Sequence, residues 1–166
     1  RARALAAAAG AHLYSLWFGI LFIVLAGPTW LLAVTAREPA STWRIAHRAG
    51  RWLFRGSGTA LAVRGLEHLP AGPCVLVANH SSYLDGFVLV ASLARPFAFV
   101  AKRELQGQWL VGRFLRCLGC EFVQREDARL SVEAAGRMAE RVQQGLSLLV
   151  FPEGTFVAAP GLLAFH

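Results

Sequence analysis

The 24 residues from Leu13 to Ala36, LYSLWFGILFIVLAGPTWLLAVTA, contain no charged side chain, and this run constrains the fold more than any other feature. As a helix it would be about 36 Å long, enough to cross a hydrocarbon core of roughly 30 Å. Gly27-Pro28 lies past its middle and is expected to kink or break the helix. The run is therefore one kinked membrane span or a shallow helix pair that enters one leaflet and returns. A cleaved signal peptide is a third interpretation, but the run is too long for one.

A basic stripe follows this apolar run. Arg44, Arg48, Arg51 and Arg55 recur at helical spacing and fall on one narrow face of a helix. Apolar residues on the far side would give a helix that lies in the headgroup region of an anionic membrane. A solvated helix face is the alternative. Arginines are denser after the apolar run than before it, which favours the cytoplasmic face of a bacterial inner membrane for the rest of the chain. We therefore assign residues 1–57 to a membrane-associating helical segment.

The composition narrows the class of protein. The chain is 55% hydrophobic and carries a net charge of +7, which indicates a negatively charged partner. It has no nucleic-acid-binding motif, so we expect a membrane surface or a phosphorylated substrate and no nucleic acid. Three cysteines do not form a disulfide framework. Cys117 and Cys120 have C-x2-C spacing without a second pair, which favours packing over a zinc site, and we expect no metal.

From about Gly58 the pattern changes to short apolar runs that alternate with amphipathic stretches. This alternation predicts an α/β fold, a mixed sheet flanked by helices, over residues 58–166. Strands are expected at 59–66, 74–79, 97–102, 121–123 and 146–151, and helices at 83–94, 108–118 and 130–145.

Polar residues interrupt the apolar runs in CVLVANHSSYLDGFVLV, Cys74 to Val90. His80 follows a predicted buried strand, and Asp85 lies in the first turn of the next helix. In open α/β sheets this edge binds ligands. The aspartate would hold one imidazole nitrogen protonated and leave the other to accept a proton from a substrate hydroxyl. Alternatively, both residues only cap the helix.

Two further segments are expected at the same edge. LLVFPEGTF ends a predicted strand and supplies Glu153, Gly154 and Thr155. Arg125 follows the predicted strand 121–123, and its guanidinium suits a phosphate because it binds two oxygens at once. Lys102 ends another strand, where it would meet a phosphate or remain solvated.

These residues resemble the glycerolipid acyltransferase family, which includes the 1-acylglycerol-3-phosphate acyltransferases. NHSSYLD matches its H-x4-D motif and FPEGT its third motif, while AKREL and LGCEFVQR resemble its second block. The matches keep the family's order from about Gly65 to Thr155. The resemblance implies a glycerol-3-phosphate acyltransferase-like fold with an N-terminal hydrophobic membrane helix or helix pair.

The resemblance also implies roles. His80 would be the general base and Asp85 its orienting partner. The hydroxyl of a lysophospholipid acceptor would attack the thioester of acyl-CoA or acyl-carrier protein directly, without an acyl-enzyme, a cofactor or a metal. Arg125 would bind the acceptor phosphate, and Glu153 and Gly154 would belong to the acceptor site.

The sequence departs from the family at two places. Phe156 stands where many members carry arginine, so the acceptor is either 1-acylglycerol-3-phosphate or a lysophospholipid with another head group, such as lysophosphatidylethanolamine. The fourth block is expected after His166, so we expect a truncated C-terminus and a domain that folds poorly or is inactive alone. A membrane-associated thioesterase or hydrolase and a non-catalytic lipid-binding module are the competing functions.

Overall fold

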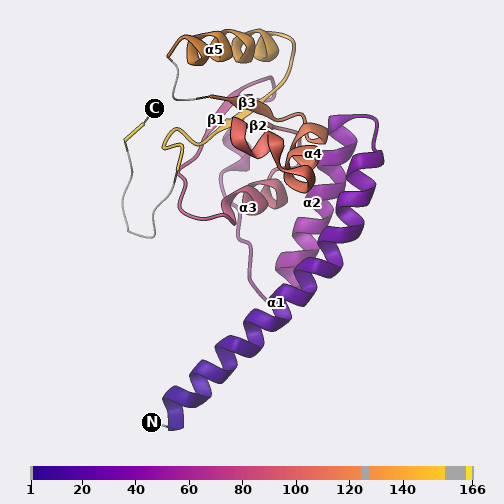
Figure 1. Ribbon diagram of the computed structural model, residues 1–166, viewed down its shortest axis with the longest axis vertical. Coiled ribbons are helices and arrows are strands. Elements are labelled where there is room, and N and C mark those ends of the chain that lie inside the picture. Colours follow the sequence, from indigo (N-terminus) through magenta and orange to yellow (C-terminus); the bar gives the residue numbers. More distant parts are fainter. Residues whose placement is uncertain (1, 125–127, 156–163, 166) are drawn as a thin grey trace.

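A computed structural model describes residues 2–124, 128–155 and 164–165 of the chain. Two long antiparallel helices lie beside a parallel sheet that carries helices on its faces (Figure 1). The elements in chain order are α1 (Ala2–Thr35), α2 (Pro39–Gly56), η1 (Leu66–His68), β1 (Val75–Val77), α3 (Asp85–Ser92), β2 (Ala98–Lys102), η2 (Arg103–Gly107), α4 (Trp109–Cys117), β3 (Glu121–Val123), α5 (Ala128–Gln143) and β4 (Leu148–Val150).

Helix α1 is continuous from Ala2 to Thr35 and contains Pro28. The alternative in which residues 13–36 form two helices is therefore wrong. A proline removes one backbone hydrogen bond, but the helix continues through the apolar residues on both sides of it. Residues 7–35 are long and apolar enough to cross a membrane, and they remain largely uncovered by the rest of the protein.

Helix α2 begins at Pro39, whose fixed φ suits the first turn of a helix. Its four stripe arginines are exposed, as predicted. The expectation that its opposite face lies on lipid is wrong, because that face packs against α1 and α3. Trp43 is fully buried there, and its indole N–H donates to the carbonyl of Leu93 at 3.0 Å. Gly50 lets α3 approach closely, since a Cβ at this position would lie 3.0 Å from the Cβ of Ala91. Helix α2 thus shares the core of the α/β domain, and the division at residue 57 remains a prediction.

The sheet has the order β1-β4-β2-β3, and every pairing among the described strands is parallel. The α/β class with flanking helices is confirmed, whereas the expected mixed sheet is parallel in this part of the chain. One face packs against α2, α3 and α4 through a core that includes Trp43, Phe97, Phe99 and Leu149. Helix α5 covers the other face through Ala134 (Figure 1).

Two strand predictions need correction. Residues 59–66 form no strand; they run as an irregular segment into η1 and have no neighbouring strand to bond with in the described sheet. The strand β1 is present but is not buried, because Val75 and Val77 are 52% and 60% exposed. Strand β1 lies at one end of the strand order, where α5 does not cover it. The other expected strands and helices are confirmed within a few residues.

Candidate active site

The carboxyl ends of parallel strands meet at one edge of a sheet, so the loops that follow β1 and β4 become neighbours. His80 lies in the loop after β1, and Glu153 lies in the loop after β4. Lys102 is the last residue of β2, the next strand along. The sheet therefore brings His80 and Glu153 together, although 73 residues separate them in the sequence.

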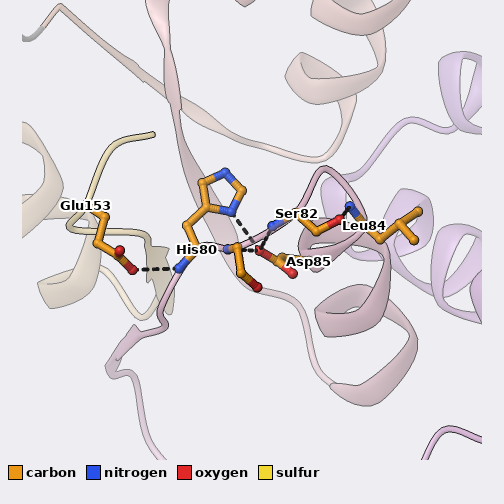
Figure 2. A network of polar contacts seen from close by, with 6 residues as sticks. His80, Ser82, Leu84, Asp85 and Glu153 are labelled. Carbon is orange, nitrogen blue, oxygen red and sulfur yellow. Dashed lines mark hydrogen bonds and ion pairs between the residues drawn. The ribbon is translucent and has the colours of Figure 1, made fainter. Parts of the chain in front are cut away.

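His80 and Asp85 form the expected pair. The imidazole Nδ1 of His80 lies 2.8 Å from Oδ2 of Asp85, the first residue of α3 (Figure 2). The same carboxylate oxygen accepts hydrogen bonds from the backbone N–H groups of Ser81 at 2.7 Å and Ser82 at 2.8 Å. The carboxylate therefore organises the whole loop as well as the imidazole. With Nδ1 donating to Asp85, the neutral ring directs its basic nitrogen, Nε2, to the other side.

The charge of Asp85 is stabilised by this arrangement. Partial burial by itself raises the pKa of its carboxyl, but the hydrogen bonds from His80, Ser81 and Ser82 outweigh it and lower the pKa below the ordinary 3.8. Asp85 is thus ionised at neutral pH. An ionised carboxylate stabilises a protonated imidazole and so supports proton transfer through His80.

Glu153 is a buried carboxylate that holds the His80 loop. Its side chain is 2% exposed, and Oε1 accepts the backbone N–H of His80 at 2.8 Å (Figure 2). The turn that positions it places Gly154 at a φ of 68°, a conformation that suits glycine. The N–H of Gly154 donates to the carbonyl of Phe151 at 3.0 Å and closes the turn.

Phe151 is a site residue that the sequence reading missed. Its ring stacks on the imidazole of His80 with centroids 4.3 Å apart and planes 23° apart. Phe99 supports it from the core at a centroid distance of 6.3 Å. The signal that could have identified it is its place in the sequence, directly before Pro-Glu-Gly. The stack restricts rotation of the imidazole and so fixes the direction of Nε2.

The other predicted site residues are not joined to His80 by the hydrogen bonds described above. Lys102 and Thr155 are exposed at the same edge of the sheet. Arg125 lies outside the described residues, as does Phe156. The structure therefore joins His80, Asp85 and Glu153 by hydrogen bonds and leaves the phosphate-binding role of Arg125 as a prediction.

The described residues include no group of three or more His, Cys, Asp or Glu side chains that would hold a metal ion. The two cysteines of the C-x2-C motif are reduced, and Cys120 is buried. Burial raises the pKa of the Cys120 thiol to about 12, so it stays protonated at neutral pH. A protonated buried thiol packs in the core and is a poor metal ligand.

Comparison with known proteins supports the motif reading. A family model described as Acyltransferase matches residues 60–166. A probable 1-acyl-sn-glycerol-3-phosphate acyltransferase of Mycoplasma pneumoniae is 32% identical over 105 residues, which are 60% of this chain and 39% of that protein. A lyso-ornithine lipid O-acyltransferase of Pseudomonas aeruginosa is 32% identical over 152 residues, which are 89% of this chain and 57% of that protein.

A solved structure shares the fold. The crystal structure of the 1-acyl-sn-glycerophosphate acyltransferase from Thermotoga maritima superposes with a TM-score of 0.70 at 26% identity. The match covers 92% of this chain and 64% of that one. The chain thus spans less than two thirds of the length of each of these relatives.

Proposed function

Because the chain belongs to the acyltransferase family, we propose that it transfers an acyl chain to the free hydroxyl of 1-acylglycerol-3-phosphate, giving phosphatidic acid. The acyl donor is acyl-CoA or acyl-carrier protein. The observation that carries this proposal is the hydrogen bond between His80 and Asp85, at the edge of the sheet where the loops after β1 and β4 meet. The relatives are named as a probable 1-acyl-sn-glycerol-3-phosphate acyltransferase and a lyso-ornithine lipid O-acyltransferase, and these names support the same reaction class.

The reaction would proceed in one addition and one elimination. Nε2 of His80 accepts the proton of the acceptor hydroxyl as its oxygen attacks the thioester carbonyl carbon. Asp85 stabilises the imidazolium that forms. The tetrahedral intermediate then expels the sulfur, which takes the proton back from Nε2 and leaves as a thiol. The ester bond replaces the thioester bond, and no acyl-enzyme forms.

The other residues would bind or position the substrates. Arg125 would hold the acceptor phosphate through two oxygens. Glu153 was expected in the acceptor site, and its hydrogen bond to the His80 backbone adds a positioning role. Gly154, Thr155 and Lys102 would complete the acceptor site at the sheet edge.

The packing of α2 along α1 supports the membrane placement that we propose. Thr42 Oγ1 donates to the carbonyl of Ala33, and the indole N–H of Trp17 donates to the carbonyl of Gly56. The exposed arginines of α2 therefore lie beside residues 17–33 of α1. If residues 17–33 of α1 crossed the bilayer, the arginines of α2 would lie inside it. Each arginine at the centre of a bilayer costs about 2.5–3.5 kcal/mol or more, so this arrangement is disfavoured.

Helices α1 and α2 are instead proposed to lie together in one leaflet at the cytoplasmic face. The part of α1 beyond α2, residues 2–16, is about 22 Å long as a helix and includes the charged Arg3, so it supplies less apolar length than a hydrocarbon core of roughly 30 Å. A cysteine introduced at Ala8 should then resist an impermeant thiol reagent on the far side of sealed vesicles. Labelling from that side would establish a span instead.

The test of the reaction is thiol release from palmitoyl-CoA by the full-length protein in membranes, with and without 1-acylglycerol-3-phosphate. Release that requires the lysolipid and disappears in His80→Ala would support acyl transfer. Release without an acceptor would favour the hydrolase. The exposed His68 provides a matched control, because His68→Ala should leave the rate unchanged. Lysophosphatidylethanolamine in place of the acceptor tests the head group.

A further inference from the structure

We propose that a pocket between the end of α2 and the segment that follows it binds the phosphate group of an anionic membrane lipid that is not a substrate. Arg51, Phe54 and Arg55 line it from α2, and residues 58–61 line it from the other side. Its volume is about 250 Å³, enough to admit a phosphate group with its neighbouring atoms. The proposal rests on the membrane placement given above and is independent of the acyl-transfer reaction.

The walls of this pocket are fixed to α1. The hydroxyl groups of Tyr14 and Thr59 lie 2.9 Å apart, and the indole N–H of Trp17 donates to the carbonyl of Gly56 at 3.1 Å. Phe54 is only 6% exposed. The segment 58–61 is therefore attached to α1 through Thr59, although it has no regular secondary structure.

The charge of the pocket selects an anion. Arg51 and Arg55 lie one turn apart on α2, and none of the described residues that line the pocket is acidic. Neither arginine forms an ion pair with any residue in the described part of the chain. The guanidinium of Arg55 lies 5.9 Å from the centre of the Trp52 ring, which orients it without neutralising it. Two arginines at one pocket suit a phosphate, because each guanidinium can donate two hydrogen bonds to its oxygens.

The surroundings favour a lipid phosphate over a phosphate ion in solution. The two α1 residues that hold the pocket wall also present exposed apolar surface, with Tyr14 47% and Trp17 51% exposed. Leu13 and Leu16 extend this surface and are 68% and 62% exposed. A phosphate in the pocket would thus place attached acyl chains along α1. Tyrosine and tryptophan are typical of this depth in a membrane, where one end of the side chain meets water and the other meets lipid.

The same helix offers an internal control. Arg44 and Arg48 belong to the same exposed stripe as Arg51 and Arg55 but do not line the pocket. A diffuse attraction between the stripe and an anionic surface would use all four arginines about equally. A discrete site requires Arg51 and Arg55 and tolerates loss of the other two.

The test uses calorimetric titration of the full-length protein carrying His80→Ala, held in micelles of an uncharged detergent. The probes are dihexanoylphosphatidylglycerol, dihexanoylphosphatidylcholine and inorganic phosphate. We expect one phosphatidylglycerol to bind per protein. The double variant R51Q/R55Q should weaken that binding by roughly tenfold or more, as loss of charge-assisted hydrogen bonds predicts. The double variant R44Q/R48Q removes the same charge and should change it by less than about threefold.

Three results would overturn the proposal. If the two double variants weakened phosphatidylglycerol binding equally, the binding would come from the general positive charge of α2 and not from a discrete site. If phosphatidylcholine bound as tightly as phosphatidylglycerol, the pocket would not select lipids with a net negative charge. Inorganic phosphate that binds as tightly as phosphatidylglycerol would exclude the lipid as the specific ligand. Because His80→Ala cannot act as the proposed base, none of these results depends on whether the chain transfers acyl groups.

Discussion

Glu153 offers the sharpest test of how the site is built. Its buried carboxylate accepts the backbone N–H of His80, which lies in the loop that carries the proposed base. If Glu153 positions His80, Glu153→Gln should retain most activity, because the amide oxygen can accept the same hydrogen bond. Glu153→Ala should lose it, because no acceptor remains.

The magnitude follows from the unsatisfied donor. A buried N–H group that loses its acceptor costs about 1–3 kcal/mol. His80 is only half-buried, so water would replace part of the lost bond and the lower half of that range applies. At 1.36 kcal/mol for each factor of ten, kcat should fall about five- to thirtyfold in Glu153→Ala. The glutamine variant keeps an oxygen that can accept the same N–H group and should stay within about threefold of the wild type.

The assay is steady-state thiol release with varied 1-acylglycerol-3-phosphate, which separates kcat from KM. A positioning role lowers kcat and leaves the KM of the acceptor nearly unchanged. Thermal unfolding of both variants checks that the fold is retained. Equal loss of activity in Gln and Ala, with a raised acceptor KM and an unchanged melting temperature, would refute the positioning role and make Glu153 a direct ligand of the acceptor.

Substitutions at four other positions test the surrounding structure. Phe151→Leu should lower kcat about two- to tenfold, since it removes the ring stacked on His80, whereas Phe151→Tyr keeps a ring and should not. Equal kcat values for the leucine variant and the wild type in steady-state assays would show that the stack does not contribute to the rate. Asp85→Asn should destabilise the fold most at neutral pH. Folding lowers the pKa of the Asp85 carboxyl, so its ionised form stabilises the folded state at pH values above its unfolded pKa near 3.8. This stabilisation is lost as the pH falls through the pKa that Asp85 has in the folded state. Urea unfolding should therefore show a larger wild-type advantage at pH 7 than at pH 3, and an equal advantage at both would count against it. Gly112→Ala should cost about 1–3 kcal/mol, because its Cβ would lie 2.4 Å from the carbonyl oxygen of Gln106, whereas Gly136→Ala, with open space in α5, should raise the melting temperature.

The local parts of this site could be predicted from the sequence. His80 and Asp85 are five residues apart at a strand-to-helix turn, so chain geometry alone brings them within hydrogen-bonding distance. The stripe of arginines on α2 is equally local, because helical periodicity decides which face it occupies. Both predictions are confirmed at the level of geometry.

The remaining features depend on which segments become neighbours. The contacts of Glu153 and Phe151 with His80 require β4 to pair with β1, and strand order is not encoded in any single segment. The periodicity of α2 predicted an apolar face but not its partner, which is α1 and α3 instead of lipid. Residues 59–66 have the composition of a strand, but a strand also needs a hydrogen-bonding neighbour, which the described sheet does not provide.

The central proposal is that the protein transfers an acyl chain to a lysophospholipid hydroxyl with His80 as the general base, and product stoichiometry tests it most directly. The measurement incubates membranes containing the full-length protein with palmitoyl-CoA and 1-acylglycerol-3-phosphate, and quantifies phosphatidic acid and free CoA together by mass spectrometry. We predict one phosphatidic acid for each CoA released, and neither product above background in His80→Ala. Free CoA with palmitic acid in place of phosphatidic acid, or an undiminished yield in His80→Ala, would contradict the account.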